Sequence, residues 1–341
     1  MILSMAALVL SGCAMAEPIK SGEHPPVSLS AWMAEWDAKS GKEEFKKLGK
    51  RLDAVVCFAA SYDKDDHIFI SKETRDLAKQ ARKGKDSLVR YLSFVNDSIQ
   101  PDGRAKEKDT ELLKRLLADD KSIDSQVDQM IAAAKELDCN GIELDYEKQW
   151  KDEKIKQNYM LFTYRLSSAC LKNGLKLRIV LEPSAPMDME FCKGPEYVVM
   201  LYNLYGKHSG PGPKADGEFI LKTIKKMENL PEEKGVAIAT GGCIWKGASL
   251  LSDSYEKKSF LSEQEAVDIQ KKYQAKPERD PASAALHFSC KIDGKDCEVW
   301  YADRETLNAW ITTAANAGIT HVGIWRLGSN TDIEEISGTA D

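Results

Sequence analysis

Eight short apolar segments recur along the chain, and longer amphipathic segments separate most of them. Residues 122–137, 155–174 and 305–318 have the helical period, and each closes near a Gly or Asn that can end a helix. Strands that alternate with helices are typical of an α/β fold with a parallel sheet. The segments with the length and composition of buried strands are residues 27–36, 53–61, 87–95, 141–147, 175–182, 197–205, 235–244 and 321–327.

Eight strands with no Gly-Ser or Pro-rich linker between them predict one (β/α)8 TIM barrel over residues 27–341. A doubly wound sheet is the rival fold, but it usually carries a Gly-rich phosphate-binding turn after its first strand, and residues 34–45 contain none. The connection at 183–196 is too short and too Pro-rich for a full helix. Residues 287–303 predict a small β-hairpin insertion in the seventh unit, and Ser262 to Glu265 reads as a capping box that opens another helix.

The first residues predict export. They form an apolar stretch that is too short to span a bilayer and ends in small residues, as a signal peptide does. Leu-Ser-Gly-Cys at 10–13 resembles the lipobox of bacterial lipoproteins, in which Cys13 would be lipidated and become the mature N-terminus. We therefore predict a signal, lipobox and linker over residues 1–26, and a protein anchored by lipid alone to the bacterial cell membrane or cell surface. An ordinary cleaved signal peptide with a coincidental cysteine is the alternative.

The net charge argues against a nucleic-acid partner, and the cysteine count bears on disulfide bonds. A formal net charge of -6 gives no electrostatic reason to expect a nucleic-acid surface. Of the eight cysteines, seven remain after Cys13, an odd number that cannot all pair within one molecule, so most are predicted to be free thiols. Cys290 and Cys297 flank an Asp-Gly turn that would set them directly opposite each other on a hairpin. Both a disulfide and a free pair remain open there.

Three carboxylates alternate with apolar residues in the fourth apolar segment. The period of residues 141–147 is that of a strand, so Glu143, Asp145 and Glu147 share one face. Ile142 and Leu144 share the other face, which in a barrel packs on the helices. The carboxylates then point toward the barrel axis near its C-terminal mouth, where active sites of this fold are built. Their mutual repulsion should keep at least one of them protonated near neutral pH, as a general acid must be.

Two other interpretations of the carboxylate row stay open at this point. The row could be the solvated acidic end of a strand. It could also collect oxygens around a divalent cation such as Mg²⁺ or Ca²⁺. No cysteine and histidine spacing in the chain suggests a zinc site.

Residues 140–147, Asn-Gly-Ile-Glu-Leu-Asp-Tyr-Glu, resemble the signature of glycoside hydrolase family 18, Asp-Gly-x-Asp-x-Asp-x-Glu, on the fourth strand of a TIM barrel. Met-Leu-Tyr-Asn at 200–203 resembles the family's Met-x-Tyr-Asp on the sixth strand, and Gly-Ile-Trp-Arg-Leu-Gly at 323–328 resembles its last strand. The resemblance covers the chain from residue 27 to about residue 330. The chain departs from the pattern at three positions: Glu143 and Asn203 each stand where the family has Asp, and Asn140 replaces the leading Asp.

The resemblance implies roles for individual residues. Glu147 matches the family's general acid, Asp145 the residue that orients the substrate's N-acetyl group, and Tyr202 the residue that bonds its carbonyl. Trp325 matches the hydrophobic floor under the reacting sugar. The other positions predicted to bind substrate are Glu143, Asn203, Trp32 and Tyr205, and His208 could line the cleft as a loop residue.

The family's chemistry implies retaining hydrolysis in which the substrate's own N-acetyl oxygen is the nucleophile. The expected substrate is a glycan with N-acetylglucosamine in β-1,4 linkage, such as a chitin oligomer, an N-glycan core or peptidoglycan. No metal or organic cofactor is implied, and we expect a monomer. A non-hydrolytic glycan-binding lipoprotein on the same barrel is the alternative, and a metal-dependent hydrolase is a third reading. We further predict that Arg178 and Glu182, on one face of the fifth strand, form an ion pair inside the barrel.

Overall fold

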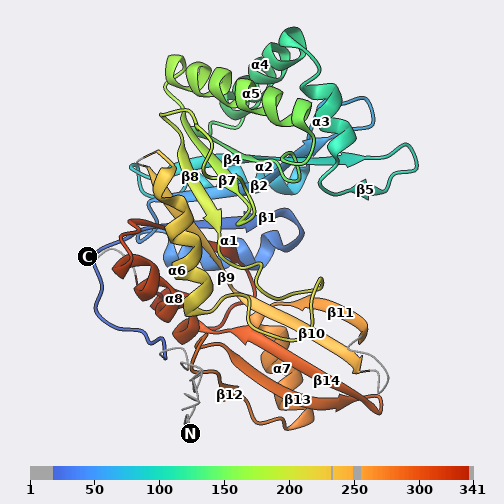
Figure 1. Cartoon of the computed structure of the whole chain (residues 1–341), viewed down its shortest axis with the longest axis vertical. Helices are drawn as coiled ribbons and strands as arrows, with labels where there is room; N and C mark the ends of the chain where they lie inside the picture. The colour runs from blue at the N-terminus through green and yellow to red at the C-terminus, as the bar shows by residue number, and fades with distance from the viewer. Residues whose placement is uncertain (1–17, 232, 249–254, 338–341) are drawn as a thin grey trace, which may run out of the picture.

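Eight parallel strands close into a barrel in the computed structural model, which describes residues 18–231, 233–248 and 255–337. Each strand pairs with the next, and the last pairs with the first. The predicted (β/α)8 barrel is therefore confirmed. Its strands are β1 (Ser28–Ala34), β2 (Ala54–Tyr62), β4 (Val89–Ile99), β6 (Gly141–Asp145), β7 (Lys176–Leu181), β8 (Glu196–Met200), β9 (Lys234–Ala239) and β15 (His321–Leu327). Figure 1 shows β1, β2, β4, β7 and β8 gathered in one part of the molecule, with helices around them.

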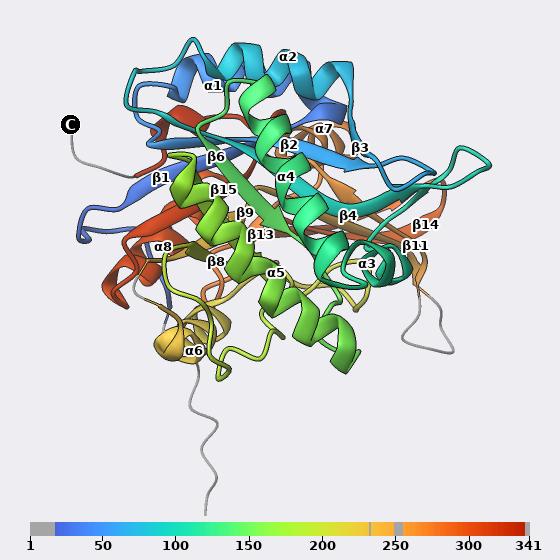
Figure 2. The ribbon, with the colours of Figure 1, turned by 90° about the horizontal axis from the view of Figure 1, so that it is seen from above.

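Helices cover the outside of the barrel, and Figure 2 shows α4 and α5 lying over the strands with α1 and α2 beside them. No helix follows β7 among the described residues, as predicted from the length and proline content of that connection. Short strands β3 (Ile68–Ile70) and β5 (Ala105–Lys106) extend the sheet beyond β2 and β4. The helices are α1 (Ala38–Leu48), α2 (Lys72–Ala81), α3 (Thr110–Leu116), α4 (Asp120–Glu136), α5 (Glu153–Lys172), α6 (Gly217–Lys226) and α8 (Arg304–Asn316), with 3-10 turns η1 (Glu35–Asp37), η2 (Met227–Asn229) and η3 (Ile333–Glu335).

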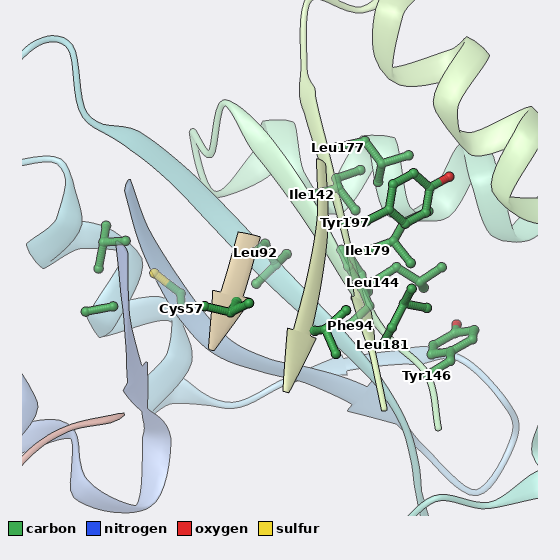
Figure 3. Packing of buried hydrophobic residues seen from close by; sticks show 14 of the residues in the cluster. Cys57, Leu92, Phe94, Ile142, Leu144, Tyr146, Leu177, Ile179, Leu181 and Tyr197 are labelled. Atoms are coloured by element: carbon green, nitrogen blue, oxygen red, sulfur yellow. The ribbon is translucent and has the colours of Figure 1, made fainter. Parts of the chain in front are cut away.

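The two faces of β6 enter different layers, as the alternation in its sequence predicts. Ile142 and Leu144 pack in the layer between strands and helices, where Figure 3 shows them beside Leu177 and Ile179 of β7. A second apolar cluster of Trp32, Ala54, Val56, Tyr91, Val180, Val198, Met200 and Ala237 fills the barrel interior. Glu143 and Asp145 therefore face inward.

The insertion after β9 is larger than the predicted hairpin. The hairpin is present as β13 (Leu286–Ile292) and β14 (Lys295–Ala302), and it belongs to a five-stranded antiparallel sheet with β10 (Gly241–Ala248), β11 (Tyr255–Leu261) and β12 (Glu278–Arg279). Helix α7 (Glu263–Tyr273) packs on this sheet and begins at the predicted capping box of Ser262. Figure 1 shows the sheet and α7 together at one end of the molecule. We refer to residues 241–302 as the insertion.

Two glycines explain why residues 235–244 form two strands instead of the single one predicted. Gly241 has a φ of +61°, a conformation that favours glycine, so the chain turns out of the barrel there. A Cβ on Gly242 would lie 1.8 Å from the carbonyl oxygen of Trp300. Only glycine allows β10 to approach β14 so closely, and the chain therefore passes from one sheet to the other at this point.

Cys290 and Cys297 are opposite residues of the β13–β14 hairpin, as predicted from their spacing. Asp293 and Gly294 at its turn both have positive φ, which suits a two-residue hairpin connection. Both thiols are free, as is every other cysteine that the structure describes. Of the two alternatives for this pair, the structure has the free one.

Part of the segment predicted as a linker packs on the domain. The backbone N–H of Ile19 donates to the carbonyl of Pro281 at 3.1 Å, and that of Gly22 donates to the Thr312 hydroxyl at 3.2 Å. The predicted export signal and Cys13 lie outside the described residues. Within the described part of the chain, no helix is long and apolar enough to cross a membrane.

Candidate active site

A cavity of about 550 Å³ opens at the carboxyl ends of the barrel strands. The ends of β2, β4, β6, β8, β9 and β15 form its floor and one side, and the insertion forms another wall. This is the face on which barrels of this kind carry their chemistry. The lining residues are Trp36, Phe58, Val95, Asn96, Asp97, Glu107, Lys108, Asp145, Glu147, Met200, Tyr202, Asn203, Tyr205, Gly206, His208, Lys214, Thr240, Phe260, Leu261, Ser262, Glu265, Trp325, Arg326 and Gly328.

The backbone of Glu147, two residues beyond β6, is held by Asn96 at the end of β4. The amide N–H of Glu147 donates to Asn96 Oδ1 at 2.9 Å, and Asn96 Nδ2 donates to the Glu147 carbonyl at 3.1 Å. Asn96 is itself buried. This paired bond fixes the direction in which the Glu147 side chain leaves the chain and enters the cavity.

The carboxyl of Glu147 is almost buried and interacts with charges of both signs. Lys108 Nζ lies 2.6 Å from Glu147 Oε2, and the side chain of Glu147 is 12% exposed. Burial raises the pKa of Glu147 to about 7, Lys108 opposes that rise, and the carboxyl of Glu182 adds to it. Near neutral pH the group therefore exists in both protonation states, which suits a residue that first donates and then accepts a proton.

Asp145 lies in the cavity wall next to Glu147. Burial raises its pKa well above the ordinary value, and the charges of Glu147 and Glu143 raise it further, against Lys108. Its Oδ1 has no hydrogen-bond partner among the described residues. A buried polar oxygen without a partner is costly, so Asp145 is ready to bond a group that enters the cavity.

Glu143 lies below the cavity floor. It is fully buried, and Trp32 Nε1 donates to its Oε1 at 2.7 Å. Burial raises its pKa to about 7, against the charge of Arg178, whose Nη1 is 3.7 Å from Oε2. Neither Glu143 nor the buried Trp32 lines the cavity, which differs from the prediction that both bind substrate. The side chains of both residues face the barrel axis, but they lie one layer of residues below those that line the cavity.

The predicted ion pair of Arg178 with Glu182 is wrong. Arg178 Nε instead donates to Glu196 Oε2 at 2.8 Å, because the two residues are register partners on β7 and β8. Four residues along a strand span about 13 Å, which separates Arg178 near the base of the barrel from Glu182 at its mouth. Glu182 Oε2 accepts the backbone N–H of Lys148 at 3.2 Å.

Aromatic rings form much of the remaining floor. Trp325 lies parallel to Tyr202, with ring centroids 6.4 Å apart, and meets Phe58 edge-on at 4.8 Å. Trp36 at the rim is 60% exposed. Such faces can support the apolar side of a sugar ring.

The insertion side of the cavity contains the predicted Tyr205 and His208, together with Phe260 from β11. Tyr205 is 38% exposed and Phe260 is 59% exposed. Asn203 also lines the cavity, beside Tyr202. The structure therefore brings together Glu147, Asp145, Tyr202, Asn203, Trp325 and Tyr205 of the predicted set.

The carboxylate row does not form a cluster with metal-ligand geometry. Among the residues that the structure describes, the one group of three suitable side chains whose ligand atoms converge is Asp63, Asp65 and His67. That group lies on the turn between β2 and β3, outside the cavity lining. The acidic row of β6 is thus arranged along a strand and not around a point.

Comparison with known proteins gives consistent matches. The model of the family described as "Glycosyl hydrolases family 18" matches residues 32–330. The chain is 23% identical over 301 residues to "Uncharacterized glycosylase YvbX" of Bacillus subtilis, covering 82% of each chain. Its fold is similar to that of the spore cortex-lytic enzyme SleL of Bacillus cereus (TM-score 0.76, 17% identity, 94% of this chain and 76% of the other). It is also similar to a mutant class V chitinase from Nicotiana tobaccum in complex with NAG4 (TM-score 0.71, 14% identity, 90% and 96%).

Proposed function

Because the chain belongs to glycosyl hydrolase family 18, we propose that it cleaves β-1,4 linkages next to N-acetylglucosamine by retaining, substrate-assisted hydrolysis. Membership of the family supports glycosidase activity for this protein. The observation that carries the finer proposal is the pair of neighbouring carboxyls at the cavity, Glu147 with a pKa of about 7 and Asp145 with a pKa raised well above its ordinary range. One such pair suffices where the nucleophile belongs to the substrate.

The residues at the cavity then divide the work. Glu147 donates a proton to the glycosidic oxygen and later accepts one from the attacking water. The unpartnered Asp145 accepts a hydrogen bond from the acetamido N–H, which keeps the acetamido oxygen directed at the anomeric carbon and steadies the positive charge that forms. Tyr202 donates to the acetamido carbonyl side, Asn203 bonds a sugar hydroxyl, and Trp325 supports the ring. No step requires a metal or an organic cofactor.

The substrate class is a glycan that contains N-acetylglucosamine. Chitin oligomers, the N-glycan core and peptidoglycan all contain the linkage, and the matched proteins include a chitinase described with NAG4 and a spore cortex-lytic enzyme. A cleavage panel over these three glycans, read by mass, would identify the preferred one and show whether the cut is internal or terminal.

The test of the mechanism is Glu147→Gln, which keeps the shape and removes the acid. We expect cleavage of a GlcNAc oligosaccharide to fall by roughly 100-fold or more. Glu111→Gln is the matched control, because Glu111 is an exposed residue of α3 that pairs with Lys114. Undiminished cleavage by the Glu147 variant would refute the mechanism. An intact oligosaccharide that the wild-type protein binds tightly would instead support the non-hydrolytic glycan-binding protein.

We also propose that the protein is exported, anchored by a lipid at Cys13 and monomeric. The lipobox-like Leu-Ser-Gly-Cys at 10–13 supports the anchor. Cys13→Ala should move the protein from the membrane fraction to the soluble fraction and abolish incorporation of a labelled fatty acid. Light scattering on the chain without its signal segment should give the mass of one copy, and a dimer mass would overturn the monomer.

A further inference from the structure

The charges that line the cavity are not spread evenly. Asp145 and Glu147 lie on the β6 side, whereas Lys214 and Arg326 lie toward the β8 and β15 ends, near the insertion. The first set is explained by the hydrolysis of the glycosidic bond. The second set has no part in that reaction.

Lys214 is the cavity-lining cation without an acidic partner. Lys108 is paired with Glu147 at 2.6 Å, and Arg326 is paired with Asp37 at 2.7 Å. Among the described residues, no ion pair or side-chain hydrogen bond is made by Lys214. A cation that is partly withdrawn from water without a counter-charge is costly to keep, which is why such groups are normally paired.

The cavity-lining carboxyl that the insertion contributes, Glu265, is already engaged. Glu265 Oε2 accepts from the backbone N–H of Ser262 at 2.7 Å and from its hydroxyl at 3.0 Å, as part of the capping box of α7. Glu265 therefore serves the end of α7, and among the described residues it forms no ion pair with Lys214.

The position of Lys214 is fixed by the chain around it. Its carbonyl accepts the backbone N–H of Leu204 at 3.1 Å, and Asp216, two residues later, caps α6 by accepting the Phe219 N–H at 2.7 Å. Its Nζ lies 5.3 Å from the ring centroid of Phe260 on β11. Burial lowers the pKa of Lys214 to about 8, the Cys243 thiol opposes this fall, and the charge of Arg326 adds to it. The ammonium is thus held in place, poorly hydrated and repelled by its neighbour, so a bound anion would relieve it.

We propose that Lys214, beside the ring of Phe260, binds a carboxylate carried by a sugar unit of the substrate in the part of the cavity next to the insertion. This inference rests on the proposed function, because it takes the occupant of the cavity to be a glycan. The substrate class becomes an acidic glycan that contains N-acetylglucosamine. A single ammonium matches the single charge of a carboxylate, which two sources supply: an ether-linked lactyl group, as on a muramic acid, or a uronic acid.

The test compares an acidic glycan with its neutral counterpart. A muramic-acid-containing oligosaccharide and the same oligosaccharide with its carboxyl converted to the primary amide have nearly the same shape and differ in charge. The wild-type protein should prefer the acid form by about tenfold in kcat/KM, as a charge-assisted hydrogen bond provides. A parallel pair made from a uronic-acid-containing oligosaccharide distinguishes the two sources of the carboxylate.

Lys214→Met should reduce this preference to near onefold, and Lys214→Arg should retain most of it. Lys222→Met is the matched control, because Lys222 is an exposed lysine of α6 that does not line the cavity. Equal turnover of acid and amide by the wild-type protein, for both sources, would overturn the subsite. So would an acid preference that survives in Lys214→Met.

Binding measurements separate this inference from the proposed function. In the Glu147→Gln background, calorimetric titration with the acid and amide oligosaccharides measures the preference without turnover. Tighter binding of the acid form, lost in the Lys214→Met double variant, supports the subsite even if the wild-type protein cleaves none of the glycans. That result would refute the hydrolytic function alone. Equal binding of acid and amide would refute the subsite alone.

Discussion

At the scale of single residues, Lys108 is the neighbour that holds the pKa of Glu147 down, while burial and Glu182 raise it. The cation favours the ionised form of the acid, so it limits how alkaline the solution can become before the proton is lost. A general acid must hold its proton in the free enzyme. If Glu147 is the general acid, as we propose, Lys108 helps to set the alkaline limb of the pH profile of kcat/KM.

Replacing Lys108 with Met should move that alkaline limb to higher pH. Without the cation, the pKa of Glu147 rises further above about 7, and the acid stays protonated in more alkaline solution. Lys106→Met is the matched control, because Lys106 lies two residues before Lys108, at the end of β5, and pairs with Asp109 at 2.7 Å. A pH profile of Lys108→Met that does not move, or moves to lower pH, would show that the contact is not functional. Lys108→Arg should keep the wild-type profile.

Some residues that line the cavity could be predicted from the local sequence, and others could not. Glu147 and Asp145 are predictable because alternation on a strand is local, so one short segment indicates which side chains face inward. Asn96 and Lys108 support Glu147 from β4 and from the connection that follows it, and only the folded barrel brings them close. Trp32 and Glu143 show the converse, because alternation predicts that a side chain faces inward but not how deep it lies below the mouth.

At the scale of elements, the insertion has its own apolar core, separate from the two clusters of the barrel. Ile244 on β10, Phe288 on β13 and Val299 on β14 pack in it with Ala266 of α7. The sequence predicts the β13–β14 hairpin because its turn has a recognisable Asp-Gly signal. It does not predict β10 as a separate strand, because the Gly-Gly break at 241–242 lies inside a continuous apolar run whose first half is a barrel strand.

Phe288→Ala should destabilise the insertion more than the barrel. Removing a fully packed ring costs about 3–5 kcal/mol, and the loss falls on the small core that contains it. Hydrogen exchange read by mass should show faster exchange in β10, β13 and β14, with β6 and β7 still protected. Phe69→Ala is the control, because Phe69 on β3 is 43% exposed. Uniform loss of protection over the whole chain would show that the insertion and the barrel unfold as one unit.

At the scale of the whole molecule, the buried acids make folding stability depend on pH. The pKa of Glu143 is raised from 4.5 to about 7 in the folded protein, so the folded state holds a proton that the unfolded state releases. Stability from this group is fully present below about pH 4.5 and is lost as the pH rises to about 7. Asp145 and Glu147 act in the same direction, since their pKa values are also raised.

Glu143→Gln should therefore flatten the pH dependence of the free energy of unfolding. Between pH 5 and pH 8 the ionisation of buried Glu143 should lower the free energy of unfolding of the wild-type protein by on the order of 3 kcal/mol. The neutral amide of the variant does not ionise, so this loss should be absent. Arg178, whose Nε donates to Glu196 at 2.8 Å in the wild-type protein, should keep this partner in the variant. Urea unfolding at a series of pH values measures the effect, with Glu111→Gln as the control. A variant whose stability falls with pH as steeply as the wild type would show that Glu143 is not the group responsible.

The two ends of the insertion lie side by side. Gly241, where the chain enters it, and Ala302, where the chain leaves it, are register partners on β10 and β14. A segment whose two ends are adjacent can be replaced by another such segment, because the flanking parts of the barrel do not have to move. The barrel carries the acid and the insertion carries Phe260 and the far wall. Grafting residues 241–302 from one barrel onto another would therefore change one wall of the cavity and leave Glu147 and Asp145 in place.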